Sequence, residues 1–393
     1  MKNYNIILIL EYFRSVPYYL SIIKYLSKEY KIAIYQVKIE DTLLEKNQEA
    51  QNDFIALCKE MGADIIRKSR VHTDLLIIPQ RTYLKSAQND ILNNIISKEN
   101  VGVLTLAWAG FKNADDFIKQ FKIHKLFAID LGLIQFLLES RNKKNQYFSN
   151  ELIEVGYPYV KYPIFEGFKA DYMLAIPTPF SFAHERDKWS FLETVIQIIN
   201  KIDDKDLIVF KSHNGIDKEQ LASSKLFMIA KLINKIPFLT DLIINNIVRD
   251  SSVKTKVIGR IYTAILFLKV MDKVIPLDSL NPSYQVGLET FLPGVKKGVI
   301  GGLSNTIYAT LYSKLPFYNC VDLIAQDRNA NNKLYKEKKP STTIELNLKY
   351  FGVPFCEGEL EFDRTNFKII SDSTRKADLI LEIKNTMTQI NNN

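Results

Sequence analysis

Two short stretches of the sequence combine residue types that suit the binding of a phosphate. One is Lys211-Ser-His213, at the end of an apolar run over residues 207–211, and the other begins with Gly301 and Gly302. The second stretch continues with the polar residues Ser304, Asn305 and Thr306. Cationic side chains, together with hydroxyl and backbone N–H donors at the start of a helix, can hold an anion. We therefore expect one phosphate site; the alternative is an ordinary turn in which the glycines only permit a sharp bend.

The residues around these stretches suggest a nucleotide rather than a lone phosphate. Lys211 and His213 occupy alternate positions, so they point to the same side of a strand and could neutralise a phosphate leaving group. The structural alternative for His213 is a hydrogen bond near a turn. Thr178 and Ser181 follow a predicted strand over residues 172–176 and are expected to form one wall of a nucleotide pocket. A rigid proline-containing loop is the alternative for that segment.

A general base is expected from the first half of the chain. Glu11 directly follows the first predicted strand, residues 5–10, and a carboxylate with a raised pKa can take a proton from a sugar hydroxyl. Trp108 and Asp130 also follow predicted strands, and we assign them to acceptor binding, with Trp108 stacking on a sugar ring. The structural alternatives are a helix cap or surface charge for each carboxylate and a core position for the tryptophan. The carboxylates that compete with Glu11 as the base are Asp115, Asp116 and Asp130.

Alternating apolar and amphipathic segments must position these residues. Such repeated βα units predict parallel sheets with helices on both faces, and ligands bind at the carboxyl ends of parallel strands. The predicted strands are 5–10, 31–37, 64–67, 75–79, 101–107, 125–130, 153–156, 172–176, 207–211, 298–301 and 317–319. The predicted helices include 14–28, 45–61, 87–97, 185–202, 284–291, 307–313 and 375–384.

A stretch over residues 156–167 contains two prolines and has no helical period, which predicts a linker between two domains. We expect two Rossmann-like α/β domains, over residues 1–160 and 166–384, that face each other across a cleft, and a flexible tail over 385–393. The first would bind the acceptor and the second the nucleotide sugar.

The second predicted domain contains a basic segment over residues 221–273. It has nine lysines and arginines but three acidic residues, and the basic residues alternate with leucine, isoleucine, phenylalanine and valine at helical spacing. One interpretation is an inserted set of amphipathic helices that attaches to an anionic membrane. The other, equally weighted, is an insert that packs on its own domain and exposes a solvated basic face.

The composition narrows the possible partners. The 393-residue chain carries a net charge of +8, which suits an anionic partner, but no run of arginine with interleaved aromatic residues indicates nucleic acid. Its three separated cysteines form no disulfide framework, which favours a reducing, cytoplasmic compartment. The sequence has no long apolar segment without charges, so no transmembrane helix is expected. No cofactor and no metal ion are expected, because neither a Gly-x-Gly-x-x-Gly motif nor a metal-spaced His/Cys/Asp cluster occurs.

Three motifs, over roughly residues 206–318, resemble the bacterial GT-B glycosyltransferases that use CMP-sugars to transfer sialic acid, polysialic acid or Kdo. They are Lys211-Ser-His213, where Asn214 stands in place of the usual proline, Ile275-Pro-Leu-Asp-Ser-Leu280, and Gly301-Gly-Leu-Ser-Asn-Thr306. The resemblance implies that His213 and the loop Ser304 to Thr306 contact the CMP phosphate and that an acid of the first domain is the base. Residues 305–316 hold no acid, which favours an inverting enzyme over a retaining one.

The expected function is therefore metal-independent, inverting transfer of a sugar onto a bacterial surface glycan, free or lipid-linked. The expected site is cytoplasmic, at the inner membrane face if the basic segment binds lipid. CDP-glycerol transferases share the Lys-x-His and Ser/Thr layout, so a CDP-glycerol or UDP-sugar donor stays open. Two rival functions also stay open: a nucleotide-sugar 2-epimerase, built on the same two domains, and a non-catalytic glycan-assembly protein.

Overall fold

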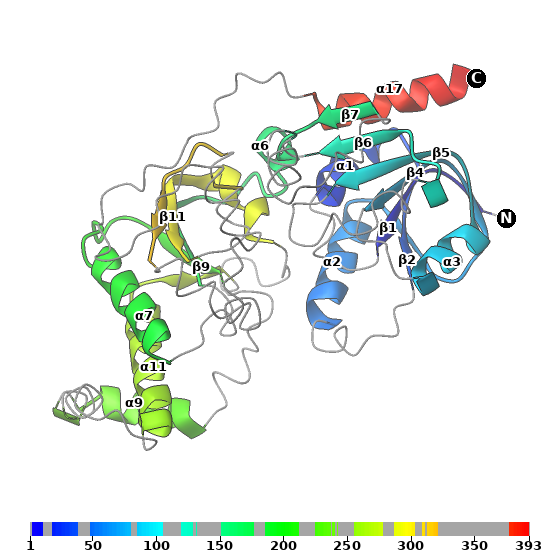
Figure 1. Cartoon of the computed structure of the whole chain (residues 1–393). Helices are drawn as coiled ribbons and strands as arrows, with labels where there is room; N and C mark the ends of the chain where they lie inside the picture. Colours follow the sequence, from blue (N-terminus) through cyan, green and yellow to red (C-terminus); the bar gives the residue numbers. More distant parts are fainter. Residues whose placement is uncertain are drawn as a thin grey trace, which may run out of the picture. The chain divides into compact units, whose positions relative to one another are not determined.

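The computed structural model describes residues 2–10, 18–37, 48–79, 85–104, 119–128, 131, 151–176, 185–211, 225–236, 238–239, 242, 255–277, 287–302, 309–310, 313–320 and 377–392. The chain divides into two compact units (Figure 1). Unit 1 comprises Met1–Glu166, Ser283–Pro293 and Ile370–Asn393, and unit 2 comprises Gly167–Pro282 and Gly294–Ile369. The sequence assigns residues 283–293 and 377–384 to the second domain, but they belong to unit 1. The cleft between two domains stays a prediction.

Unit 1 is built around a parallel sheet of seven strands. Its core is apolar on both faces, as expected of a parallel sheet between helices: residues Ile6 to Leu10, on an inner strand, are all fully buried. The strands lie in the spatial order β3 (Asp64–Ile66), β2 (Ile32–Gln36), β1 (Lys2–Leu10), β4 (Val71–Pro79), β5 (Ile95–Leu104), β6 (Lys125–Ala128) and β7 (Glu151–Glu154). The direction of winding reverses between β1 and β4, which makes the carboxyl end of β1 a topological switch point.

The helices of unit 1 come from both ends of the chain. In the described part of unit 1 they are α1 (Tyr19–Leu26), α2 (Gln48–Glu60), α3 (Lys85–Asn94), the short α6 (Pro158–Lys161) and the C-terminal α17 (Leu379–Asn392). Helix α17 begins beside β7, where the Ala377 backbone N–H donates to the Glu154 carbonyl at 2.8 Å. The last residues of the chain therefore complete a unit that its first residues began.

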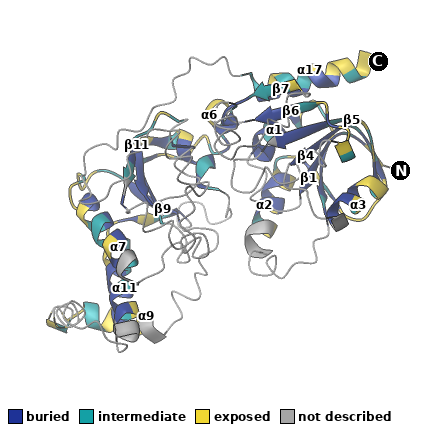
Figure 2. Cartoon of the chain, viewed as in Figure 1, coloured by how far each residue is buried: buried dark blue, intermediate teal, exposed yellow. Residues whose placement is uncertain are grey.

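Unit 2 has a parallel sheet of five strands with the same winding. Its order is β10 (Ile275–Pro276), β9 (Ile208–Lys211), β8 (Ala170–Ala175), β11 (Val295–Gly301) and β12 (Phe317–Asn319). Here the winding reverses between β8 and β11. The parallel α/β class predicted from the sequence is thus confirmed for both sheets, and Figure 2 shows the buried strands.

One face of the unit 2 sheet is covered by α7 (Glu185–Ile199) and α11 (Thr255–Met271). Their apolar side chains share a core cluster with Leu174, Phe210 and Ile300. The Trp189 indole N–H of α7 donates to the Thr263 hydroxyl of α11 at 2.8 Å, which joins the two helices. Helix α11 is therefore part of the core of unit 2, although the sequence predicts an insert over this region.

Two predicted boundaries inside unit 1 were wrong. The helix expected over residues 87–97 ends at Asn94, and β5 begins at the next residue. Strand β4 also starts at Val71, four residues earlier than expected, because it pairs with β5 from Val71↔Ile95 to Pro79↔Val103. The pairing along β4 overrides the local helical pattern, as tertiary context often does.

Three further expectations differ from the structure. Residues 284–291 are expected to form a helix, but the described part of this stretch contains only the 3₁₀ turn η4 (Leu288–Thr290). Gly287 before it and Pro293 after it disfavour a longer helix. The expected linker contains helix α6, which starts at Pro158, where the missing N–H costs nothing. The expected flexible tail is helical to Asn392, because Ile383 and Met387 form a fully buried stripe.

Candidate functional site

The strand ends that the sequence assigns to phosphate binding lie at one edge of the unit 2 sheet. Lys211 is the last residue of β9 and stands in register with Ala175, the last residue of β8. Gly301, the last residue of β11, is also in register with Ala175 and, on its other side, with Asn319. Adjacent strands are about 4.8 Å apart, so the backbones of Lys211 and Gly301 are roughly 10 Å apart. Both lie at the carboxyl edge, where doubly wound sheets bind ligands.

Close packing fixes the end of β11. A Cβ atom added to Gly301 would lie 2.6 Å from the Ala175 carbonyl oxygen, closer than real side chains come. On the other side, the Cys320 backbone N–H donates to the Gly301 carbonyl at 2.9 Å. The glycine is thus required by the approach of β8, and the Gly301–Gly302 turn leaves the sheet from a fixed point.

The Lys211 side chain is buried, with an exposed fraction of 7%. Side chains alternate along a strand, and Phe210 belongs to the core cluster under α7 and α11. Lys211 therefore faces the other side of the sheet, the side that its register partners Ala175 and Gly301 also face. A lysine is rarely buried unless its ammonium has a partner, because burial disfavours the charged form. The structure places the three described residues of the predicted phosphate site at one edge of the sheet: Lys211, Gly301 and Gly302.

The other predicted site residues lie outside the described part of the chain, and their roles stay predictions. In the sequence, Glu11 comes directly after the last residue of β1, and His213 comes two residues after the last residue of β9. The remaining members of this set are Trp108, Asp130, Thr178, Ser181, Ser304, Asn305 and Thr306.

Two tyrosines near the switch point of unit 1 gave no signal in the sequence. The Tyr19 hydroxyl lies 2.8 Å from the Ile9 carbonyl and 3.1 Å from the Ile77 carbonyl, so it joins the ends of β1 and β4. The neighbouring Tyr18 hydroxyl is buried and has no hydrogen-bond partner among the described residues. Burial raises the pKa of both phenols, so both are neutral donors. Only knowledge of which strands are adjacent would have identified them.

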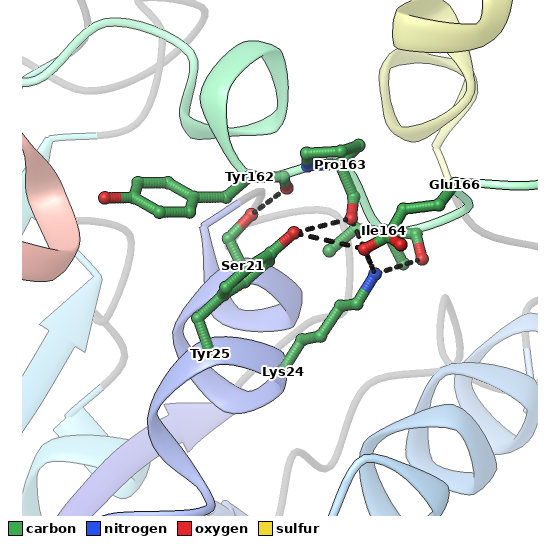
Figure 3. Close-up of polar contacts among 7 residues, drawn as sticks. All are labelled: Ser21, Lys24, Tyr25, Tyr162, Pro163, Ile164 and Glu166. Carbon is green, nitrogen blue, oxygen red and sulfur yellow. Dashed lines mark hydrogen bonds and ion pairs between the residues drawn. The ribbon is translucent and has the colours of Figure 1, made fainter.

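The polar cluster at the end of the expected linker has a structural role (Figure 3). The Lys24 ammonium of α1 donates to the Pro163 carbonyl at 2.8 Å, the Ile164 carbonyl at 3.0 Å and the Glu166 carboxylate at 2.8 Å. This contact with Lys24 holds the pKa of the Glu166 carboxyl below its usual value. The last residues of unit 1 before the chain enters unit 2 are therefore fastened to α1.

The described residues offer neither a reactive thiol nor a metal centre. Burial raises the pKa of Cys58 and of Cys320 far above the usual thiol value, so both remain protonated. Within the described ranges, no group of three or more His, Cys, Asp or Glu side chains could hold a metal ion. The same part of the chain has no helix long and apolar enough to span a membrane.

No family model and no curated protein matches the sequence. Among solved structures, the chain is similar to a glycosyltransferase from Rickettsia africae, with 13% identity, 81% of this chain and 79% of that chain covered, and a TM-score of 0.33. It is also similar to a putative UDP-N-acetylglucosamine 2-epimerase from Listeria monocytogenes, with 10% identity, 88% of this chain and 90% of that chain covered, and a TM-score of 0.40. A third similar structure is the calicheamicin glycosyltransferase CalG4, with 8% identity, 85% of this chain and 84% of that chain covered, and a TM-score of 0.33. At TM-scores of 0.33 to 0.40, these likenesses carry no argument about what this chain does.

Proposed function

We propose that the protein is a glycosyltransferase whose unit 2 binds a nucleotide-sugar donor at the carboxyl edge of its sheet. The observation that supports this most is the common register of Lys211 and Gly301 on the two strands that flank β8. A cation and a glycine turn at one edge suit a phosphate that also approaches backbone N–H groups. Thr178 and Ser181 would form one wall of the pocket that binds the nucleotide of the donor.

The proposed donor is a CMP-sugar, with sialic acid or a related keto-sugar acid as the group transferred. This choice comes from the motif order Lys-x-His, Ile-Pro-x-Asp-x-Leu and Gly-Gly-x-Ser-Asn-Thr. In the structure the second motif begins in β10, which pairs with β9 through Ile275↔Val209 and Pro276↔Phe210. The first residue of each of these two motifs therefore lies on one of two neighbouring strands, which supports a shared donor site.

The proposed reaction is a single displacement with inversion. Glu11 takes the proton of the acceptor hydroxyl as that oxygen bonds to the anomeric carbon, and the bond from this carbon to the CMP phosphate oxygen breaks. The electron pair of the broken bond leaves with CMP. Lys211, His213 and the Ser304 to Thr306 loop take up the charge on the departing phosphate. No metal ion is needed for this step if those groups neutralise the phosphate.

The proposed acceptor is a bacterial surface glycan, free or lipid-linked, and Trp108 and Asp130 are the residues assigned to it. Nucleotide sugars are cytoplasmic metabolites, so we place the reaction in the cytoplasm, at the inner membrane face where the acceptor is lipid-linked.

A nucleotide screen tests the proposal directly. Thermal unfolding of the full chain would be measured with CMP, CDP, UDP and GDP and their sugar conjugates, with and without EDTA. A ligand that binds only the native state adds about 2.7 kcal/mol at a hundredfold excess over Kd. Stabilisation by CMP alone, unaffected by EDTA, is expected. A response to UDP or GDP would overturn the CMP donor, and no response to any nucleotide would overturn the transferase and favour a non-catalytic assembly protein.

A product assay separates transfer from epimerisation. The CMP-sugar would be incubated with the protein in the presence and absence of a glycan acceptor. Release of CMP coupled to acceptor elongation is expected. Conversion of the donor sugar to its epimer without any acceptor would instead identify a 2-epimerase.

A further inference from the structure

Helix α9 (Lys225–Asn234) of unit 2 has two different faces. On one face Ala230 is fully buried and packs against Ala264, Ile265 and Leu268 of α11, and Ile233 lies beside them. Among the described residues, this contact holds α9 against α11 of unit 2. Apart from Ile233, the larger apolar side chains described on α9 lie on the other side of the helix.

Those larger side chains are exposed. Met228 and Leu232, one turn apart, have exposed fractions of 57% and 65%, and Phe238, just beyond the helix, has 70%. Six of the eleven large apolar residues that are exposed in the described part of the chain lie between residues 228 and 242. In the cartoon of Figure 2, exposed residues are coloured yellow, and parts of α9 have this colour. A cluster of this kind is costly in water and marks an interaction surface.

Lysines are interleaved with the apolar side chains. Lys231 and Lys235 are exposed and alternate with Leu232 and Ile236 on the same side of the helix, opposite Ala230. The described residues between 225 and 242 include no aspartate or glutamate. We call this surface the α9 outer face, made up of Met228, Ile229, Lys231, Leu232, Lys235, Ile236, Phe238 and Leu242.

We propose that the α9 outer face docks the protein on an anionic lipid membrane. Apolar side chains of this size can enter the region between headgroups and acyl chains, while lysines extend their stems and keep their charge among anionic headgroups. A second copy of the chain is a poor occupant, because the lysines of the two faces would meet one another and no acid among the residues of this face would pair with them. This docking is peripheral, and it goes beyond the proposed function because it does not depend on which nucleotide is bound.

The α9 outer face belongs to the basic segment of the sequence. Residues 221–273 contain nine basic and three acidic side chains, so most of the net positive charge of the chain lies in this segment. An anionic surface attracts such a segment over about one Debye length, near 8 Å at physiological ionic strength. Electrostatic attraction and apolar insertion therefore favour the same docking.

Flotation with lipid vesicles tests the inference. The full-length protein would be mixed with vesicles of phosphatidylcholine alone or with about 30 mol% phosphatidylglycerol, at low and high salt. We expect binding only to the anionic vesicles, weakened by salt. The double variant Met228→Ser/Leu232→Ser should lower the partition coefficient at least about tenfold. The double variant Lys231→Gln/Lys235→Gln should lower it about fivefold per lysine, since each lysine near the surface contributes about 1 kcal/mol.

Matched controls keep the test independent of folding. Leu92→Ser and Leu381→Ser remove apolar side chains with similar exposure from α3 and α17, and Lys201→Gln/Lys205→Gln removes two exposed lysines from another surface of unit 2. These variants should float like the wild type, and all variants should keep the wild-type melting temperature and nucleotide response. The proposal is overturned if the wild type does not bind anionic vesicles, if the controls lose as much binding, or if the α9 variants only dissociate a dimer.

Discussion

Lys211 and Gly301 stand in register with one residue, Ala175, from the two strands on either side of it. This register places the buried Lys211 and the glycine Gly301 on the same face of the unit 2 sheet, at its carboxyl edge. In the proposed donor site, we expect the phosphate to contact the Lys211 ammonium.

The first prediction concerns the charge of Lys211. Lys211→Met keeps most of the side chain's volume but removes the cation. We expect the Kd for CMP to rise about tenfold to a hundredfold, since a hydrogen bond to a charged group contributes roughly 1.5–3 kcal/mol. Calorimetric titration of CMP measures the change. Lys205→Met, at an exposed lysine of the loop before β9, is the control and should leave the Kd unchanged. If the wild type and both variants bound CMP with equal affinity, Lys211 would not contribute to binding.

The second prediction concerns the packing of Gly301. In Gly301→Ala the new Cβ would lie 2.6 Å from the Ala175 carbonyl oxygen, so β8 and β11 must separate. Overpacking of this kind costs about 1–3 kcal/mol, which a urea unfolding curve would detect. Gly167→Ala is the matched control, because a Cβ at Gly167 would meet nothing within 4 Å. If the two variants unfolded at the same urea concentration, the close approach of β8 would be wrong.

Both sheets could be predicted from the sequence, but the contacts across them could not. Apolar runs such as residues 5–10 indicate buried strands on their own. A strand that ends in Lys211 predicts that this edge of the sheet binds a ligand. That Gly301 needs to be glycine depends on Ala175, more than a hundred residues away, and no local pattern contains that information. The length of α17 was missed for a similar reason: residues 385–392 are polar in composition, and only the burial of Met387 makes them helical.

The third prediction compares two neighbouring tyrosines. Tyr18→Phe removes a buried hydroxyl that has no partner in the described part of the chain, so we expect stability to rise by about 1 kcal/mol. Tyr19→Phe removes a hydroxyl that contacts the Ile9 and Ile77 carbonyls, so stability should fall by about 1 kcal/mol. Each variant is the control for the other, since both delete one oxygen from a fully buried ring. Shifts of the same sign in chemical denaturation would contradict the assigned contacts.

The fourth prediction concerns Asp378, which lies just before α17 and which we call the α17 anchor. Its contribution to stability should depend on pH. Asp378 accepts hydrogen bonds from the Ile380 N–H at 3.0 Å and the Leu381 N–H at 3.2 Å, and it contacts Lys161 and the Tyr162 hydroxyl. Burial alone would raise the pKa of Asp378, but hydrogen bonds from Lys161 and Tyr162 outweigh it and hold the pKa below its usual value.

A depressed pKa has a definite consequence for stability. The ionised carboxylate stabilises the folded state above the unfolded pKa, about 3.9, and this contribution is lost as pH falls through the lower folded pKa. Asp378→Asn should therefore cost about 1 kcal/mol at neutral pH and progressively less below about pH 4. Urea unfolding at a series of pH values measures the difference. Asp204→Asn, in an exposed loop of unit 2, should show no such dependence. A cost that stayed constant down to about pH 2 would exclude the ionised anchor.

The last prediction concerns the two residues assigned to catalysis. Glu11→Gln keeps the shape of the proposed base but cannot accept the acceptor proton, and His213→Ala removes a donor to the leaving phosphate. General base catalysis contributes about 10²–10⁴-fold, so each variant should lose at least two orders of magnitude in kcat. The two should differ in binding: Glu11→Gln should keep the wild-type Kd for CMP, while His213→Ala should weaken it. Initial rates and CMP titrations on the same samples separate these effects. Full turnover by both variants, with wild-type melting temperatures, would mean that neither residue takes part in the reaction.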